Sequence, residues 1–360
     1  MDSFDVFHSN NQLTRCARPW ASLMLYPNAS GPECHLSNTF LENTANRSIN
    51  ELWNSVKFIE LRQDILDGQY PESCNTCPEK NVGLEYYSQF DYLKFERNSA
   101  LNYIKNRNEY LKGSTKLESR PISISVDLQY PCNFQCDMCD LRLRKEKITL
   151  KQEQELFNQY AGPSVHMHFS GGEPLLHKGF LEYLQSDAQK PTSISITTNG
   201  SLLSRDLLDG LLSFPYVNLH ISIDSFDPDI FAKLRPGPLG LNEILEKVKL
   251  AVEYKERINK QTSEHRWHIC LQMVPILNNI EEFPQYIDNA YNMNIDEISS
   301  CPISGDFPDQ DFTKYPNILD NIDVPPLLSE IKYKMKKYTA LEISQMDNYL
   351  SVLTSYTHSE

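Results

Sequence analysis

Short apolar segments alternate with longer amphipathic segments from residue 122 onward. Each apolar segment is rich in β-branched residues and predicts a strand, and each amphipathic segment predicts a helix. The predicted strands are 122–128, 165–169, 193–198, 217–223, 267–274 and 295–301. The predicted helices lie near 149–160, 178–188, 204–212, 240–257 and 281–292. Because parallel strands need a helical crossover between them, this rhythm predicts an α/β fold with a partial (β/α)6 barrel.

Composition and charge exclude several classes of partner. Acidic residues outnumber basic ones by 48 to 34, and no Lys/Arg run is dense enough to follow a phosphate backbone. The N-terminus lacks the basic start and apolar stretch of a signal peptide, and no later run reaches the length of a membrane span. We therefore expect a cytoplasmic protein that binds neither nucleic acid nor a membrane.

The first third of the chain lacks the strand–helix rhythm. Residues 1–83 contain short runs, Pro and Gly turns and four of the nine cysteines, which predicts a small cysteine-rich domain held together by metal. Residues 84–120, rich in Tyr, Asn and Lys, predict a linker with a helix and a polar loop. The barrel is predicted over 121–301 and a C-terminal extension over 302–360.

Seven of the nine cysteines fall into two groups, while Cys270 and Cys301 stand apart. Grouped thiols in a reducing compartment usually bind metal. The first group is Cys16, Cys34, Cys74 and Cys77, and the second is Cys132, Cys136 and Cys139.

The second group forms a Cys-x3-Cys-x2-Cys pattern in the segment DLQYPCNFQCDMCD, directly after the first predicted strand. Catalytic loops of a barrel emerge at that end of the strands. Three thiolates would bind three irons of a cubane cluster and leave the fourth iron open to another ligand. Zinc would need a fourth protein ligand, and the nearby His166 and His168 lie within a predicted strand, which favours core or solvent positions for them.

The following strand ends carry further polar motifs. The second strand runs into Ser170-Gly171-Gly172-Glu173-Pro174, where the glycines permit close backbone approach to a ligand and Glu173 offers a carboxylate to an ammonium group. The third strand ends in Thr197-Thr198-Asn199-Gly200, and the fourth ends in His220-Ile221-Ser222-Ile223-Asp224. We expect these side chains to share one rim of the sheet.

Together these motifs resemble the radical S-adenosylmethionine (SAM) superfamily over residues 122–301. The resemblance implies that Cys132, Cys136 and Cys139 hold a [4Fe-4S] cluster whose open iron is chelated by the amino and carboxylate groups of SAM. The cofactor-binding residues that it implies are Gly171, Gly172, Glu173, Asn199, Ser222, Asp224, Arg235 and Met138.

Two of these positions carry alternatives. Met138 stands where relatives often have an aromatic residue, and its thioether can still cover the adenine. Arg235, in the segment KLRPG, resembles an arginine that many relatives aim at a carboxylate, but it could equally be a solvated arginine at a helix end.

The implied activity is one-electron reductive cleavage of SAM to methionine and a 5′-deoxyadenosyl radical, which abstracts hydrogen from a substrate. That activity requires a low-potential electron donor such as flavodoxin or ferredoxin.

The N-terminal cysteines admit zinc or a second cubane, and their spacing alone leaves both open. The Cys-x2-Pro-Trp opening, the ELWNS and FIELR segments and the closing Cys-x2-Cys resemble a SPASM/twitch domain, which binds an auxiliary iron–sulfur cluster. Such domains usually follow the barrel, whereas this one precedes it. Four cysteines would ligate one cubane completely, which favours electron transfer or structural support.

Three functions therefore stay open. The favoured one is radical modification of a peptide or peptide-derived natural-product precursor, and the alternative is radical modification of a sugar, nucleotide or amino-acid derivative. A non-catalytic zinc-binding interaction protein is the most distant. Cys301, at the end of the sixth predicted strand, is the candidate catalytic residue because a thiol there could return a hydrogen atom to a substrate radical. The alternative for Cys301 is a packed strand-end cysteine, and Cys270 is expected to be buried.

Overall fold

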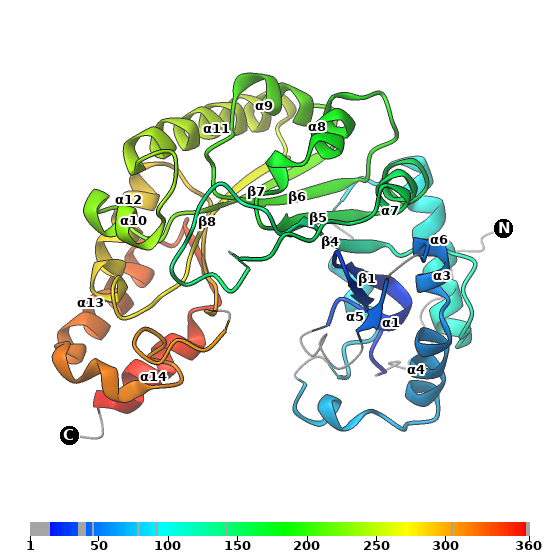
Figure 1. The fold of residues 1–360 in the computed structure, drawn as a ribbon, viewed down its shortest axis with the longest axis horizontal. Helices are drawn as coiled ribbons and strands as arrows, with labels where there is room; N and C mark the ends of the chain where they lie inside the picture. Colours follow the sequence, from blue (N-terminus) through cyan, green and yellow to red (C-terminus); the bar gives the residue numbers. More distant parts are fainter. Residues whose placement is uncertain are drawn as a thin grey trace. The chain divides into compact units, whose positions relative to one another are not determined.

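The computed structural model describes residues 15–34, 41–44, 47–77, 80–90, 93–141, 143–303 and 305–357. The chain forms two compact units, and Figure 1 follows it through both. The first unit comprises residues 1–126, 148–168 and 188–193, and the second comprises 127–147, 169–187 and 194–360. Three strands supply residues to both units: β4 (Ser123–Gln129), β5 (His166–Gly171) and β6 (Ser193–Thr198). The sequence-based domain boundaries remain predictions.

The second unit is built on a parallel sheet. Its remaining strands are β7 (Tyr216–Ser222), β8 (Trp267–Met273), β9 (Glu297–Ser300) and β10 (Glu342–Ser344). The strand order is β10-β9-β8-β7-β6-β5-β4, and β7–β8, β8–β9 and β9–β10 pair in parallel. All six predicted strands are present, so the α/β fold class with a mostly parallel sheet is confirmed. The short β10, from the C-terminal extension, was not predicted.

The two faces of this sheet differ in chemistry. Phe169 on β5 packs on Phe180 of α8 (Lys178–Gln185) with ring centroids 4.3 Å apart, and Trp267 on β8 stacks on Tyr254 of α11 (Leu241–Thr262) at 6.0 Å. Figure 1 shows α8, α9 (Arg205–Leu211) and α11 along this apolar face. Half-buried polar residues alternate with the apolar ones, as in Asn218, His220 and Ser222 of β7. The helices therefore cover the apolar face, and polar side chains of β7 point to the other face.

The helices that follow the strands match the predicted ones closely. They are α7 (Leu150–Glu155, continued by a π turn to Tyr160) in the first unit, and α8 (Lys178–Gln185), α9 (Arg205–Leu211), α11 (Leu241–Thr262) and α12 (Phe283–Asn292) in the second. The structure adds α10 (Pro228–Leu234), and the C-terminal extension, where one or two helices were expected, contains α13 (Val324–Lys337) and α14 (Asp347–Thr357). Among the described residues, no helix combines the length and the apolar composition needed to cross a membrane.

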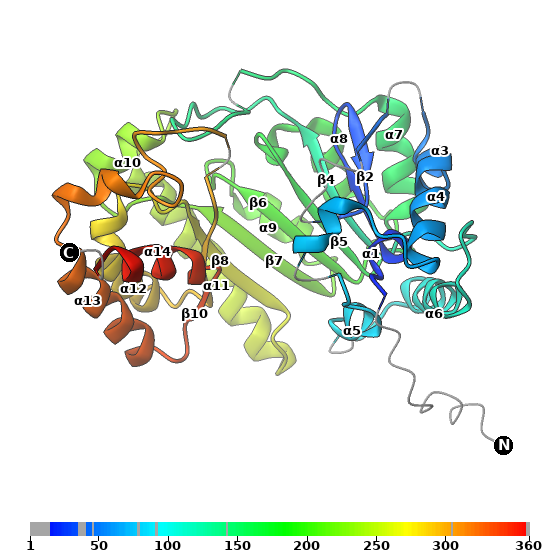
Figure 2. The same ribbon diagram turned by 90° about the horizontal axis from the view of Figure 1, so that it is seen from below.

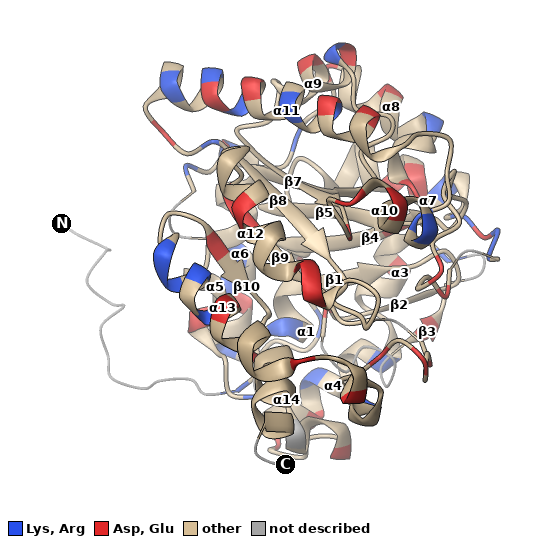
Figure 3. Cartoon of the chain, turned by 90° about the vertical axis from the view of Figure 1, so that its left-hand side faces the viewer, with Lys and Arg blue, Asp and Glu red and all other residues tan. Residues whose placement is uncertain are grey.

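Outward-facing helix surfaces in the second unit are charged and hydrogen-bonded. Figure 3 shows acidic and basic residues mixed along α11, as expected for a solvated helix face. Helices α12, α13 and α14 lie together (Figure 2). Asp288 of α12 pairs with Lys334 of α13 and accepts a hydrogen bond from the Tyr338 hydroxyl at 2.8 Å.

The first unit holds the N-terminal cysteines. Its elements include α1 (Arg18–Ala21), β1 (Ser22–Leu25), β2 (Ala29–Gly31), β3 (Glu42–Asn43), α3 (Ile49–Trp53), α4 (Val56–Leu66), α5 (Leu84–Ser88) and α6 (Arg97–Lys112). Strand β1 pairs in parallel with β4, β2 in antiparallel with β1, and β3 in antiparallel with β2.

The fully buried Arg62 of α4 fixes three segments of this unit together. Its guanidinium donates to the carbonyls of Pro19, Trp53 and Thr115 at 2.8, 3.0 and 2.8 Å. Burial lowers the pKa of Arg62 to about 9, so its charge depends on these acceptors for compensation.

Candidate functional site

A loop of residues 130–141, here called the cysteine loop, follows β4 in the second unit. Backbone hydrogen bonds hold it: Gln135 N donates to Pro236 O at 2.8 Å, and Asp137 N donates to Leu234 O at 3.1 Å. The Phe134 ring lies so close to Gly237 that a Cβ there would stand 2.4 Å from the ring carbons. The loop is therefore fixed along the segment that follows α10.

The three cysteines of this loop are half-buried, and two of them accept hydrogen bonds. Cys132 Sγ accepts from Phe134 N at 3.4 Å and from Asn199 Nδ2 at 3.7 Å, while Cys136 Sγ accepts from Arg235 Nη1 at 3.6 Å. Burial raises the pKa of Cys132, and it raises that of Cys136 to about 11, so binding a metal here would release protons from these thiols.

The glycines of the GGEP motif are required by the backbone around them. Gly171 has φ of +107°, and a Cβ on it would stand 2.5 Å from Gln129 O. A Cβ on Gly172 would stand 2.1 Å from Tyr130 O. Gly172 N also donates to Gln129 O at 2.8 Å. Close packing against the start of the cysteine loop thus explains both glycines, beyond the approach of a ligand that the sequence indicated.

Glu173 is completely buried and ties this turn to the end of β6. Its Oε1 accepts from Thr198 Oγ1 at 2.9 Å and from Leu175 N at 3.0 Å, and its Oε2 accepts from Asn199 N at 2.8 Å. Burial raises the pKa of Glu173 to about 7, and these donors partly offset the effect. One carboxylate therefore joins the GGEP turn to the TNG turn.

Asn199 links the TNG turn to the cysteine loop. Besides its contact with Cys132, its Nδ2 donates to Asn133 Oδ1 at 2.9 Å. Its Oδ1 accepts from Ser201 N at 2.9 Å, which fixes the orientation of the amide. Ser222, also expected at this rim, lies half-buried at the end of β7, with its backbone in register with Gln272 of β8.

Asp224 and Arg235 form a buried ion pair, with Arg235 Nε donating to Asp224 Oδ2. The side chain of Asp224 is fully buried and that of Arg235 is 10% exposed, so the alternative of a solvated arginine is wrong. Met138 is buried against Leu234 and Ile276, in an apolar cluster that also contacts Cys136.

Cys301 follows β9 directly and is half-buried. Its backbone N donates to Met273 O at 2.8 Å, and its carbonyl accepts from the Tyr349 hydroxyl at 2.7 Å. Burial raises the pKa of Cys301 to about 11, so the thiol stays protonated at neutral pH. Cys270 is fully buried, as expected.

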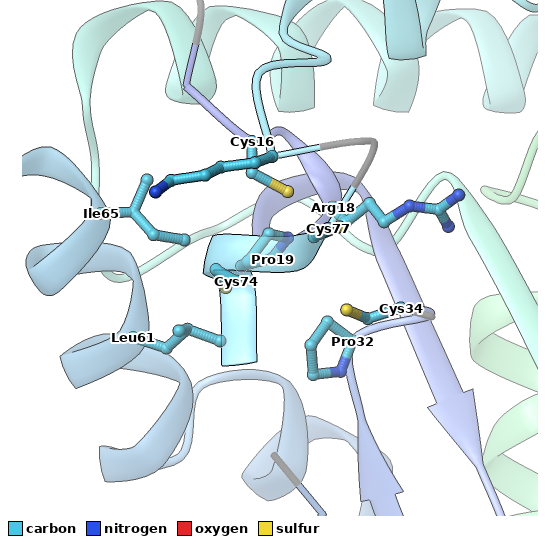
Figure 4. Close-up of a pocket in the computed structure, with 10 residues that line it drawn as sticks. Cys16, Arg18, Pro19, Pro32, Cys34, Leu61, Ile65, Cys74 and Cys77 are labelled. Carbon is cyan, nitrogen blue, oxygen red and sulfur yellow. The ribbon is translucent and has the colours of Figure 1, made fainter. Parts of the chain in front are cut away.

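The four N-terminal cysteines line one pocket in the first unit (Figure 4). Cys16 precedes α1 and Cys34 follows β2. Cys74 lies within a 3₁₀ turn, Glu72–Thr76, and Cys77 follows that turn directly. Leu61 and Ile65 of α4 line the same pocket, together with Arg18, Pro19, Pro32 and Lys80. Burial raises the pKa of Cys16 to about 12. The sequence grouped these cysteines correctly.

Two groups of thiols could hold an iron–sulfur cluster. Within the described part of the chain, no three His, Cys, Asp or Glu side chains are arranged around a point that could hold one metal ion. Each thiolate of a cubane binds a different iron, so its ligands need not converge on one point. The cysteine loop supplies three such thiols, and the N-terminal pocket supplies four.

Several residues of the site were not singled out from the sequence. Asp127, at the end of β4, accepts from Ser170 Oγ at 2.7 Å, and Asn133 and Gly237 contact Asn199 and Phe134 as described. Asp127 could have been singled out from the sequence, because a carboxylate stands there shortly before the cysteine loop. The partners of Asn133 and Gly237 lie far away in sequence and left no local signal.

Comparisons with known proteins agree with this arrangement. The profile of the radical SAM superfamily matches residues 128–290. A GTP 3′,8-cyclase of Crocosphaera subtropica is 36% identical over 119 residues, which cover 30% of this chain and 35% of that protein. A GTP 3′,8-cyclase of Alkaliphilus oremlandii is 31% identical over 140 residues, covering 36% and 43%. The chain thus spans less than half of the length of these curated relatives.

Among solved structures, Streptococcus suis SuiB bound to S-adenosylmethionine has a TM-score of 0.45 at 16% identity, covering 89% of this chain and 71% of SuiB. The superfamily profile covers the strand end that carries Cys132, Cys136 and Cys139, the GGEP turn and the TNG turn. Members of that superfamily use a [4Fe-4S] cluster and S-adenosylmethionine. Over residues 128–290 the chain therefore contains a radical SAM domain.

Proposed function

We propose that this protein cleaves SAM reductively and starts radical chemistry on a bound substrate. The observation that carries the proposal is the cysteine loop, which presents three half-buried thiols beside the GGEP and TNG turns. Three thiolates leave one iron of a cubane open to the cofactor. The bound cluster would supply one electron to the sulfonium, giving methionine and a 5′-deoxyadenosyl radical that takes a hydrogen atom from the substrate.

The chain's own residues would hold and orient the cofactor. Gly171 and Gly172 keep the turn close to the cysteine loop, so that backbone groups of the turn would lie beside a cluster held there. Glu173 has three protein donors on a carboxylate with about four acceptor positions, so one position is left for the SAM ammonium group. Asn199 and Ser222 lie at the ends of β6 and β7 and complete the rim.

We further propose an auxiliary [4Fe-4S] cluster on Cys16, Cys34, Cys74 and Cys77, in a domain spanning residues 1–83. Support comes from the shared pocket and from the resemblance to SPASM/twitch segments. Four thiolates would saturate this cluster, which suits electron transfer or structural support. A low-potential donor such as flavodoxin or ferredoxin in the cytoplasm would supply electrons, and free thiols persist in that reducing compartment.

The substrate that we propose is a peptide or peptide-derived natural-product precursor, as the SPASM/twitch resemblance implies. The second candidate is a small molecule, and the curated relatives favour a nucleotide because both are named GTP 3′,8-cyclase. The polar face of the sheet in the second unit supplies hydrogen-bonding groups that suit either class. LC–MS of reactions with GTP, and with a peptide encoded beside the gene, would separate the two.

The activity is tested with anaerobically reconstituted protein, dithionite and SAM, following 5′-deoxyadenosine by chromatography. We expect the wild type to form it and the Cys132→Ala/Cys136→Ala/Cys139→Ala variant to lose it, while the buried-cysteine control Cys270→Ala keeps it. The triple variant should retain about four irons per chain, the content of one cubane. Product formation by the triple variant would refute the proposal, and zinc in place of that iron would refute the auxiliary cluster.

A further inference from the structure

A charged hydrogen-bond donor is held against one of the cluster cysteines. Arg235 Nη1 donates to Cys136 Sγ at 3.6 Å, whereas the donors to Cys132 are a backbone amide and the Asn199 side-chain amide. Cys132 and Cys136 therefore have unlike surroundings: the first accepts from neutral groups and the second from a cation.

The arginine is positioned by a network that leaves it little freedom. Arg235 Nε donates to Asp224, and the other oxygen of that carboxylate accepts from Val274 N at 2.7 Å. Asn279 Nδ2 donates to both Asp224 O and Val274 O, at 2.9 and 3.0 Å. The segment that follows β8 thus holds Asp224 in place, and Asp224 in turn holds the Arg235 guanidinium.

The start and end of α10 place Arg235 at the right point. Asp227 caps the helix, its Oδ1 accepting from Asp229 N and Ile230 N at 2.9 Å, and Pro228 stands at the first helical position. The helix ends at Leu234, whose carbonyl accepts from Asp137 N of the cysteine loop at 3.1 Å. The same helix end therefore binds the loop backbone and directs the arginine at the loop's sulfur.

We infer that the Asp224–Arg235 pair sets the reduction potential of the SAM-binding cluster through Cys136. The inference rests on the proposed function, because it takes Cys136 as a cluster ligand. Reduction adds one negative charge to a cluster, and a nearby cation or hydrogen bond to a ligand sulfur stabilises the reduced form. Arg235 raises the potential, and Asp224 limits the rise by neutralising part of the guanidinium charge.

This assignment predicts opposite effects for the two partners. In Arg235→Gln the cluster loses the cation but keeps the buried carboxylate nearby, so the potential falls. In Asp224→Asn the cation is no longer neutralised, so the potential rises. A pair that served only to hold the fold together would give shifts of one sign or none, because either substitution breaks the same ion pair.

The experiment is a redox titration of reconstituted holoenzyme without SAM, followed by electron paramagnetic resonance of the reduced cluster. We work in the background of Cys16→Ala, Cys34→Ala, Cys74→Ala and Cys77→Ala, which leaves one cluster to observe, and repeat key points in the full protein. At a fixed ambient potential we expect the ratio of reduced to oxidised cluster to fall about tenfold in Arg235→Gln, equal to about 59 mV for a one-electron couple. Asp224→Asn should shift this ratio the other way.

Lys255→Met is the matched control. Lys255 is also a buried cation in the second unit, paired with Asp296 at 2.9 Å, but the pair lies where β9 begins. We expect it to lower thermal stability without moving the cluster potential. If Arg235→Gln fails to fold, the double variant Asp224→Asn/Arg235→Gln, which buries no unpaired charge, takes its place and should still lower the ratio because the sulfur loses its cationic donor.

The outcomes separate this inference from the function beneath it. An assembled cluster with unchanged potential in both single variants would overturn the inference and leave SAM cleavage standing. Potential shifts of the same sign in both variants would also overturn it. A protein with no cluster on Cys132, Cys136 and Cys139 would refute the proposed function itself. Reduced SAM affinity in Arg235→Gln with an unchanged cofactor-free potential would assign the arginine to the cofactor carboxylate.

Discussion

Glu173→Gln removes a carboxylate whose protonation is coupled to folding. Burial raises the pKa of Glu173 from an ordinary 4.5 to about 7, so between these values the folded chain binds more protons than the unfolded chain. The stabilisation is fully present below about pH 4.5 and is lost as the pH rises through about 7. The pKa difference corresponds to roughly 3 kcal/mol of unfolding free energy. Glutamine has the same size and does not titrate.

The assay is anaerobic thermal unfolding of wild type and Glu173→Gln from about pH 5 to about pH 8. The range from pH 5 to pH 8 covers about 2.5 kcal/mol of this difference. For a unit of this size, 1 kcal/mol shifts the midpoint by about 2–4 °C, so the wild type should lose roughly 5–10 °C relative to the variant. Glutamine also turns an N–H₂ group towards one of the buried donors, such as Asn199 N, and this cost is the same at every pH. Only the change in the difference between the two proteins therefore measures the titration.

Glu182→Gln is the control, because Glu182 is an exposed carboxylate on α8 in the same unit. Its midpoint should follow the wild type across the pH range. Parallel curves for wild type and Glu173→Gln would refute the reasoning, since they would mean that the three donors to Glu173 outweigh its burial. The Glu173 carboxylate would then be charged throughout this pH range.

Two further predictions concern Gly172, which packs against the cysteine loop, and the thiol of Cys301. Gly172→Ala places a Cβ 2.1 Å from Tyr130 O, so we expect at least about 1–3 kcal/mol of destabilisation and loss of iron from the cysteine loop. Gly210→Ala, whose Cβ would meet Leu184 O at 3.4 Å, should keep its iron, and equal iron contents would contradict the prediction. Cys301→Ala should still form 5′-deoxyadenosine but lose the final product, and wild type in deuterated water should place one solvent deuteron in that product. Normal product from the variant would leave Cys301 as a packed strand-end cysteine.

The regular part of the second unit could be predicted because its sequence follows a simple period. Val217, Leu219 and Ile221 alternate with Asn218 and His220, and the apolar set is fully or almost fully buried against the helices. A strand with one face on helices and one polar face alternates apolar and polar residues. This period of two can be recognised from the sequence without any tertiary information. The cysteine loop could also be recognised from the sequence, because its three cysteines lie within a span of eight residues.

Elements that depend on distant partners could not be predicted. Strand β10 has three residues, and only its pairing with β9 makes it a strand. Helix α10 has seven residues and was not among the predicted helices. A short element carries too few side chains to show a period, and its stability comes from contacts made elsewhere.

The same limit applied to the role of Arg235. From the sequence, the residue could be a ligand contact or a solvated side chain, because its local environment is a helix end before Pro236 and Gly237. Its partners are eleven residues away in the case of Asp224 and ninety-nine residues away in the case of Cys136. Nothing in the local pattern encodes those distances, so the burial of the pair emerged only from the fold.

The cysteine loop is held mainly by groups that no side-chain substitution removes. Its backbone donates to the carbonyls of Leu234 and Pro236, and the GGEP turn donates back to the carbonyls of Gln129 and Pro131. Such bonds survive most exchanges of the side chains involved, because the acceptors belong to the main chain. These bonds require the two backbone segments to come close together. That approach depends on glycine at positions where a Cβ would stand between the segments. The positions that permit the approach, Gly171, Gly172 and Gly237, should therefore constrain this loop more tightly than its exposed side chains do.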